Sequence, residues 1–195
     1  MVRMFIVALL LLAGCTQTPA ASPTGVPPSS AAATPTYTCS PAGGTPAPCS
    51  KDEYDKVQSE NALIAEAEAV YRKFWDENVR INQMGGVKAA TPTLRETTTG
   101  MFLEATLATY QEILDEGLTG VGDVKLVTLT PRSDLIHEGS LISLEACTDA
   151  SNLEFRRGKR RVDNGPIYVE EVYLKRFDGA LKLFYVQSKL VKSCS

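Results

Sequence analysis

Residues 167–191 read IYVEEVYLKRFDGALKLFYVQSKLV, and this stretch contains the clearest fold signal in the chain. Two runs with strand-like alternation, 167–177 and 181–191, flank the pair Asp178-Gly179. An Asp-Gly pair between two such runs is typical of a tight hairpin, because both central positions of its turn need a positive φ. We therefore predict two long antiparallel strands at the end of the chain.

Two segments upstream of this hairpin also show the period-two pattern of strands. They span 124–130 and 141–148, and they bring the predicted sheet to about four strands. The change to this period occurs after Gly122, and the pattern before it is helical.

The helical part of the sequence carries two capping-box patterns. In this pattern a serine or threonine, and a glutamate three residues later, satisfy backbone donors at the start of a helix. The first is SKDE at 50–53, which predicts a long helix that ends at Gly85-Gly86. The second is TLRE at 93–96, followed by a helix over about 101–116.

Helices that precede a run of antiparallel strands predict an α+β domain and not a parallel α/β sheet. We expect one domain over 50–195, with a long amino-terminal helix and a shorter broken helical pair packed on a curved antiparallel sheet of about four strands. Its length is sufficient for one hydrophobic core.

The first 15 residues carry a targeting signal. A basic start at 1–3 is followed by an apolar run at 4–12, which is too short to span a bilayer. Leu12-Ala13-Gly14-Cys15 then resembles the lipobox of bacterial lipoproteins. The resemblance implies that residues 1–14 are a signal peptide, and that Cys15 carries a diacylglycerol that anchors the protein at the outer face of the cell membrane.

Residues 15–49 differ in composition from the rest of the chain. Eight of the 11 prolines lie between Pro19 and Pro48, and positions 16–49 contain no charged residue. Such a composition cannot bury enough apolar surface to offset the entropy of ordering. We interpret the segment as a tether between Cys15 and the folded domain.

Four cysteines remain if Cys15 is lipidated, and three pairings of them are possible. Their spacing favours Cys39 with Cys49 and Cys147 with Cys194, and an exported protein meets oxidising conditions. The chain has no Cys-x-x-Cys pair and a single histidine, His137, which we expect on an exposed loop. We therefore predict two disulfides and no metal site.

The order of elements resembles the cone-shaped nuclear transport factor 2-like fold. Residues 37–44, 67–75 and 145–149 look like a group of secreted Gram-positive lipoproteins of unassigned function, and the match covers most of 37–194. One departure is Ala180-Leu181, because the group often has an aromatic residue just after the hairpin glycine.

Folds of this type frequently hold a pocket between helix and sheet. The resemblance implies a comparison with polyketide cyclases and ketosteroid isomerases, which use an Asp or His base with Tyr donors. Candidate pocket residues here are Tyr71, Tyr110, Glu145, Asp149, Tyr173 and Tyr185. The alternative interpretation is structural: tyrosines in the core, and an aspartate that accepts hydrogen bonds from turn amides. We predict no catalytic residue and no cofactor.

A second candidate is a run of five basic residues within six positions: Arg156, Arg157, Lys159, Arg160 and Arg161. So many like charges cannot be buried, which predicts an exposed loop or hairpin tip. The run could contact an anionic wall polymer, or it could be a solvated loop that balances an acidic helix. The net charge of −3 argues against binding to duplex DNA.

Together these features favour a non-enzymatic binding or scaffold module that is anchored in the membrane through Cys15. Its expected partner is an envelope protein or an anionic wall polymer, and not nucleic acid. One alternative is a pocket enzyme or small-molecule carrier of the polyketide cyclase and ketosteroid isomerase type. Another is an adhesin or phage-exclusion factor that acts through the basic loop.

Overall fold

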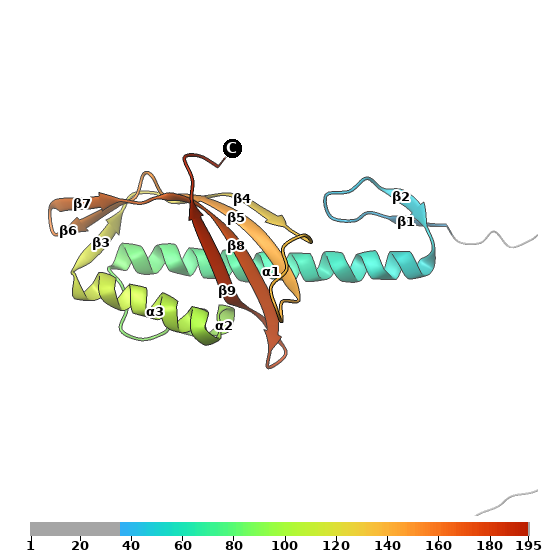
Figure 1. Cartoon of the computed structure of the whole chain (residues 1–195), viewed down its shortest axis with the longest axis horizontal. Coiled ribbons are helices and arrows are strands. Elements are labelled where there is room, and N and C mark those ends of the chain that lie inside the picture. Colours follow the sequence, from blue (N-terminus) through green and yellow to red (C-terminus); the bar gives the residue numbers. More distant parts are fainter. Residues whose placement is uncertain (1–35, 195) are drawn as a thin grey trace, which may run out of the picture. The chain divides into compact units, whose positions relative to one another are not determined.

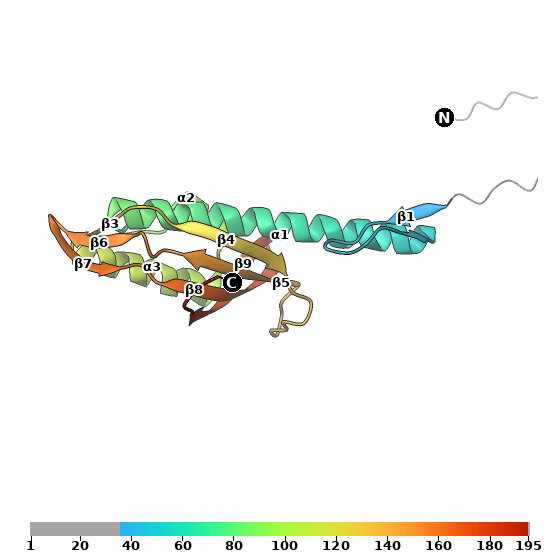
Figure 2. The same ribbon diagram turned by 90° about the horizontal axis from the view of Figure 1, so that it is seen from above.

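The computed structural model describes residues 36–194, so the predicted signal peptide and Cys15 lie outside the described part of the chain. Its central element is the helix α1 (Lys51–Met84), which at 34 residues is about 51 Å long. Figures 1 and 2 show that α1 runs beneath the sheet and continues past it at its amino-terminal end.

The predicted start of α1 is confirmed in detail. The Ser50 hydroxyl accepts a hydrogen bond from the backbone N–H of Glu53, and the Glu53 carboxylate accepts one from the Ser50 N–H at 2.9 Å. The helix ends at Gly85, whose φ of +86° places it in the left-handed region that favours glycine.

The helix α2 (Pro92–Thr97) starts two residues earlier than its predicted capping box implies. The cap is Thr91, whose Oγ1 accepts from the Leu94 N–H at 3.2 Å, and not Thr93. Pro92 explains the shift, because proline fits the first helical position, where its missing N–H costs no hydrogen bond. The helix α3 (Gly100–Asp115) follows and ends close to the predicted boundary.

The four predicted strands form one antiparallel sheet in the order β4-β5-β8-β9. They are β4 (Lys125–Pro131), β5 (Ile142–Asp149), β8 (Ile167–Phe177) and β9 (Ala180–Leu190). Asp178 and Gly179 connect β8 to β9 with φ values of +50° and +82°, as the Asp-Gly signal predicted.

The prediction of a single sheet is wrong, because the described residues form three. A second antiparallel sheet, in the order β3-β6-β7, comprises β3 (Leu118–Val121), β6 (Glu154–Arg157) and β7 (Arg160–Asn164). These strands have four or five residues each and many polar or charged side chains, so they lack a clear apolar alternation.

The third sheet lies in a segment whose composition predicted a tether. Strands β1 (Tyr37–Cys39) and β2 (Ala47–Cys49) form a hairpin closed by the Cys39–Cys49 disulfide. The Asn61 side chain on α1 holds the hairpin by accepting from the Ala42 N–H at 3.0 Å and donating to the Ser40 carbonyl at 2.8 Å. The folded unit therefore begins at residue 36, ahead of the predicted boundary at residue 50.

The hydrophobic core lies between the helices and one face of the four-stranded sheet. The helices supply Tyr71, Phe74, Ile81, Leu94 and Tyr110, and the sheet supplies Leu144, Val172, Leu174, Leu181 and Leu183. The core residues of β5 and β8 alternate in sequence, so the residues between them point to the opposite face of the sheet. This alternation determines which polar side chains of the strands can point into the space between the helices and the sheet.

Candidate ligand-binding cavity

A cavity of about 300 Å³ lies between the carboxyl-terminal half of α1, the helix α3, and the end of the four-stranded sheet where β5 finishes and β8 begins. Most of its lining is apolar and comes from Val79, Val124, Ala150, Leu153, Phe155 and Pro166. The polar lining consists of Asn78, Asn82, Thr109, Tyr110 and Tyr168. None of these residues carries a charge.

The polar groups reach the cavity from three elements of the fold, α1, α3 and β8. Asn78 and Asn82 are four residues apart on α1 and therefore share one face of that helix. Tyr110 comes from α3, and Tyr168 comes from β8, on the same face of the sheet as the core residue Val172. The cavity thus exists only when two helices and a sheet are in place.

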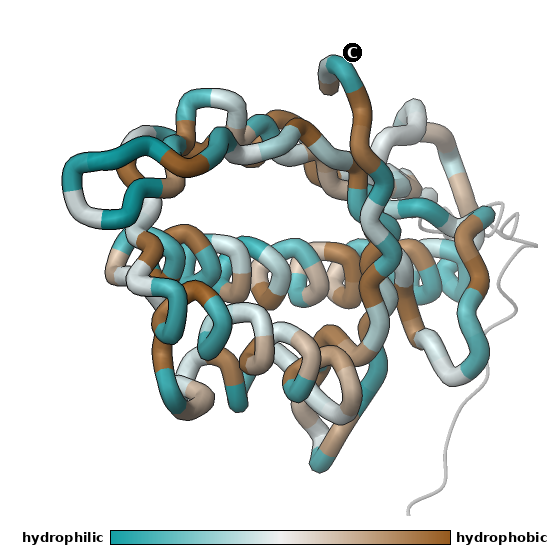
Figure 3. Tube along the Cα trace, turned by 60° about the vertical axis from the view of Figure 1, so that its left-hand side comes forward, coloured by the Kyte–Doolittle hydropathy of each residue, from teal (hydrophilic) through white to brown (hydrophobic). Residues whose placement is uncertain are grey.

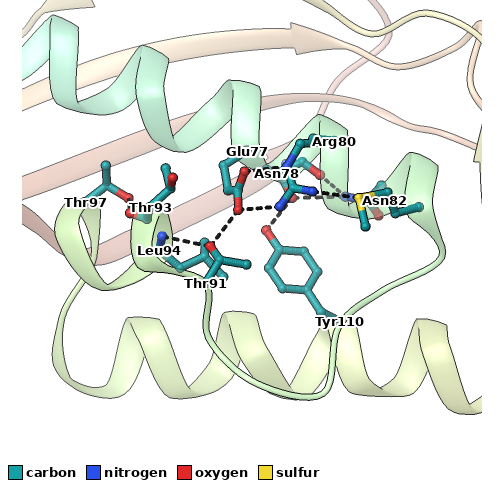
Figure 4. A network of polar contacts seen from close by, with 10 residues as sticks. Glu77, Asn78, Arg80, Asn82, Thr91, Thr93, Leu94, Thr97 and Tyr110 are labelled. Carbon is teal, nitrogen blue, oxygen red and sulfur yellow. Dashed lines mark hydrogen bonds and ion pairs between the residues drawn. The ribbon is translucent and has the colours of Figure 1, made fainter.

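Three of these polar side chains, Asn78, Asn82 and Tyr110, form a continuous hydrogen-bond chain, which Figure 4 shows. The Tyr110 hydroxyl donates to Asn78 Oδ1 at 2.7 Å. Asn82 Nδ2 donates to the Asn78 backbone carbonyl at 2.8 Å and to Asn78 Oδ1 at 3.0 Å. Burial raises the pKa of the Tyr110 and Tyr168 phenols, so both remain neutral hydrogen-bonding groups at physiological pH.

A neighbouring network fixes α2 against α1 (Figure 4). The buried Glu77 carboxylate accepts two hydrogen bonds of 2.7 Å from the Arg80 guanidinium and one of 2.6 Å from Thr91 Oγ1. The bonds from Arg80 lower the pKa of Glu77. Since Thr91 also caps α2, this carboxylate couples the position of α2 to α1.

A half-buried acid, Glu170, lies on the same face of β8 as Tyr168. The Tyr71 hydroxyl donates to Glu170 Oε2 at 2.5 Å, and the Ser188 hydroxyl donates to Oε1 at 3.3 Å. Burial raises the pKa of Glu170, because the loss of solvent disfavours the charged form of its carboxylate. Thr148 Oγ1 is fully buried near the Tyr71 and Tyr168 phenols and has no hydrogen-bond partner among the described residues.

Sequence reasoning missed Asn78, Asn82, Tyr168 and Glu170 as cavity or interior polar residues. A signal for Glu170 was present, since the alternation in 167–177 puts it on the same face as Val172 and Leu174. An acid on the apolar face of a strand indicates a special environment. Asn78 carried a similar signal, because it lies on the apolar stripe of the long helix with Tyr71 and Phe74, whereas Asn82 had none.

The structure does not bring the six predicted pocket residues together. Tyr71 and Tyr110 point into the interior, and Tyr110 alone of the six lines the cavity. Asp149, at the end of β5, accepts a hydrogen bond from the Ser151 N–H at 2.9 Å. This agrees with the alternative interpretation, in which the aspartate accepts hydrogen bonds from turn amides. Glu145 and Tyr173 lie on the opposite face of the sheet, because they alternate with core residues of β5 and β8.

On that opposite face Tyr185 stacks on His137, with 4.1 Å between ring centroids and 8° between ring planes. The expectation of an exposed histidine is therefore wrong, since His137 is half-buried by this contact. Tyr173 is the neighbour of Tyr185 across the sheet and donates to the Glu171 carboxylate at 2.9 Å. Glu145 forms an ion pair with Arg132 at 2.5 Å.

The cysteine prediction is confirmed for the four described cysteines. Cys39 pairs with Cys49, and Cys147 pairs with Cys194, with Cα–Cα distances of 5.8 and 5.7 Å. The second bond joins a buried residue of β5 to the segment that follows β9. Cys15 lies outside the described residues.

The basic run lies on the β6–β7 hairpin, whose polar character is visible in the teal colouring of Figure 3. Three of its five cations are paired within the protein. Arg156 and Arg161 contact Glu154 at 2.5 and 3.7 Å, and Arg157 contacts Glu116 at 3.1 Å. Among the described residues, Lys159 and Arg160 have no acidic partner. The positive charge available to a ligand is therefore smaller than the sequence suggests.

An open groove of about 460 Å³ was also not predicted. It lies between α1 at Glu60, Leu63 and Ile64 and the connection from β4 to β5. Ile136 and Leu141 of that connection are 85% and 51% exposed. Within residues 36–194, no cluster of three or more His, Cys, Asp or Glu side chains could hold a metal ion. None of the helices in this range is long and apolar enough to cross a membrane.

No family model matches the chain, and no curated protein matches it. One similar solved structure is the crystal structure of the intermembrane space region of the chloroplast protein ARC6. It is 15% identical in sequence, the alignment covers 64% of this chain and 95% of that one, and the TM-score is 0.45.

Proposed function

We propose that this protein is a lipid-anchored binding module at the outer face of the cell membrane, and that its folded unit takes a small ligand in the cavity between α1, α3 and the sheet. The observation that carries this proposal is the cavity itself. Its volume of about 300 Å³ is at the lower end of the range for ligand pockets. Its lining is mostly apolar with a few polar groups, as is usual for such pockets.

The cellular location in this proposal rests on two features. The lipobox-like stretch that ends at Cys15 supports the anchor. The two disulfides support an oxidising compartment, since stable disulfides are rare in the cytosol. An anchored receptor of this kind would present its cavity to the envelope.

The finer fold assignment belongs to the same proposal. We infer that the α+β unit is a variant of the nuclear transport factor 2-like cone. Support comes from the order of its elements and from the position of α1 and α3 on one face of the four-stranded sheet (Figure 1). The small β3-β6-β7 sheet and the disulfide-closed β1–β2 hairpin would be additions to that cone.

A pocket enzyme is the second candidate, and the pair of Tyr71 and Glu170 is the observation that favours it. A carboxyl group with a raised pKa keeps its proton to a higher pH and can act as a general acid. We rank this candidate second, because Glu170 is absent from the cavity lining and only Tyr168, two residues away, reaches it. The basic hairpin gives less support to an adhesin, since three of its cations are already paired.

The anchor is tested by Cys15→Ala in the organism that makes the protein. We expect the variant to move from the membrane fraction to the medium, because it lacks the acylated thiol. Replacement of Cys39 and Cys49 by alanine is the matched control and should leave the protein in the membrane fraction. Continued membrane association of Cys15→Ala would contradict the anchor.

Ligand binding is tested on the full-length protein extracted from its own membranes with a mild detergent. After denaturation, mass spectrometry should detect a co-purified small molecule. Thr109→Trp should abolish it, because Thr109 is exposed at the cavity lining and the indole would fill the space. Ala108→Trp, at the next exposed position of α3, should retain it. Equal amounts in wild type and Thr109→Trp, or none in wild type, would contradict this function.

A further inference from the structure

We propose that the cavity recognises a neutral carboxamide through the paired side chains of Asn78 and Asn82. This inference rests on the proposed function, since it assumes that the cavity is a ligand site. It is carried by a hydrogen-bond donor and a hydrogen-bond acceptor on residues one helical turn apart on α1, neither of which has a partner among the described residues.

The hydrogen bonds determine how both side-chain amides are oriented. Asn82 donates to the Asn78 backbone carbonyl, which can only accept, so the atom of Asn82 at this position is Nδ2. The same Nδ2 lies 3.0 Å from the Asn78 side chain, which must therefore present Oδ1 there. The Tyr110 hydroxyl donates to that Oδ1 as well. Flipping either amide would place two donors or two acceptors face to face.

This orientation leaves two atoms available. Asn78 Nδ2 and Asn82 Oδ1 form no hydrogen bond among the described residues. In residues 36–194 the fully buried side-chain polar atoms without a partner are Trp75 Nε1 and Thr148 Oγ1, so neither asparagine atom is sealed inside the protein. Both asparagines line the cavity. They therefore offer it one donor and one acceptor, on two side chains that are joined by a hydrogen bond.

A carboxamide has the complementary pair. Its carbonyl oxygen can accept from Asn78 Nδ2, while its N–H donates to Asn82 Oδ1. The remaining lining supplies apolar surface from Val79, Leu153 and Phe155, and no charged residue lines the cavity. An ionised ligand would have to leave water without a counter-charge, which is costly. The favoured ligand is thus a small neutral amide attached to an apolar body.

Isothermal titration of the intact mature protein with simple probes tests this chemistry. Benzamide represents ligands with a primary carboxamide, and acetanilide represents ligands with an N-substituted amide. Methyl benzoate keeps the acceptor but lacks the donor, and ethylbenzene lacks both. We expect at least one amide to bind about tenfold more tightly than methyl benzoate, since one hydrogen bond contributes roughly 1.4 kcal/mol. Tighter binding of benzamide or of acetanilide then shows whether the cavity takes a primary or an N-substituted amide.

Two variants with the same change of charge assign the donor. Asn78→Asp keeps the oxygen that accepts from Tyr110 and Asn82 but replaces Nδ2 by a second oxygen. We expect it to bind the preferred amide about tenfold more weakly. Asn152→Asp, the matched control, makes the same substitution at an exposed residue outside the cavity lining and should retain that affinity within about threefold. Thermal unfolding of both variants checks that they fold, and the probe series on wild type does not depend on either.

The outcomes separate this inference from the proposed function. Ethylbenzene or methyl benzoate binding as tightly as both amides would overturn amide recognition and leave the cavity as a ligand site. Unchanged amide affinity in Asn78→Asp would overturn the assigned donor and with it the inference. Failure of every probe to bind would overturn the inference, and absence of a co-purified molecule would in addition overturn the proposed function.

Discussion

Breaking the Cys147–Cys194 disulfide should strongly destabilise the protein although it leaves the core side chains in place. Cys147 is buried on the inner strand β5, and Cys194 follows the edge strand β9. The bond therefore carries the end of the chain back across β8. Cys194→Ala removes the bond and leaves the Cys147 side chain, which packs as a small apolar group.

The size of the effect follows from the loop that the bond closes. Its ends are 47 residues apart, and on the chain-entropy model a loop of this length is worth about 4 kcal/mol at 25 °C. This is a large share of the 5–15 kcal/mol that is usual for a folded protein. For a domain of this size, the loss corresponds to a fall in Tm of roughly 8–16 °C.

The assay is urea unfolding in a common Cys15→Ala background, followed by far-UV circular dichroism and by the fluorescence of Trp75, the single tryptophan. The matched control is Cys49→Ala, whose bond spans 10 residues and belongs to a hairpin that adds no side chain to the main core cluster. We expect this control to let the hairpin fray and to change global stability by less than about 1 kcal/mol.

Two results would refute this reasoning. The first is a loss below about 1 kcal/mol in Cys194→Ala, which would mean that the bond does not restrict the unfolded chain as the model assumes. The second is an equal or larger loss in Cys49→Ala, which would place the hairpin inside the cooperative unit.

Two further predictions concern the interior. Glu170→Gln should stabilise the protein by about 1 kcal/mol at pH 8, because glutamine keeps the hydrogen bond from Tyr71 without the buried charge. Because the folded-state pKa of Glu170 is raised, its protonated carboxyl stabilises the fold fully below the unfolded pKa, and this stabilisation is lost as the pH rises through the folded pKa. The gain in stability from Glu170→Gln should therefore shrink toward pH 4 in urea titrations. A loss of stability in Glu170→Gln at pH 8 would contradict this prediction. Gly86→Ala should lower the free energy of unfolding by about 3 kcal/mol or more in the same assay. The φ of Gly86 is +86°, and an added Cβ would lie 2.2 Å from the Tyr110 carbonyl oxygen. A loss of stability below about 1 kcal/mol would contradict that geometry.

Local chemistry allowed several elements to be predicted. The capping box at Ser50, the glycine stop at Gly85 and the Asp178-Gly179 turn each depend on residues a few positions apart. The cysteine pairing also followed from spacing along the chain. The strands β3, β6 and β7 were not predicted, because such short polar segments become strands only when a partner strand supplies their hydrogen bonds.

The candidate site was less predictable than the fold. Tyr71 and Tyr110 were correctly singled out as interior candidates, since helical spacing places them on apolar faces. Grouping them with Glu145 and Tyr173 disregarded the strand parity, which the core neighbours Leu144 and Leu174 reveal. Asn78 was marked in the sequence only by its position on the apolar stripe of the long helix, and Asn82 by nothing, so the cavity beside them gives both their role.

The sequence by itself determined the α+β class, the limits of the long helix, the terminal hairpin and the two disulfides, because each depends on short-range preferences or on spacing. The tertiary structure decided the division into three sheets, the inclusion of residues 36–49 in the folded unit, and the cavity. These features depend on contacts between distant residues. Tyr110 is 32 residues from Asn78, and Glu170 is 99 residues from Tyr71. Side chains so far apart in the chain acquire a shared chemistry only when packing places them together.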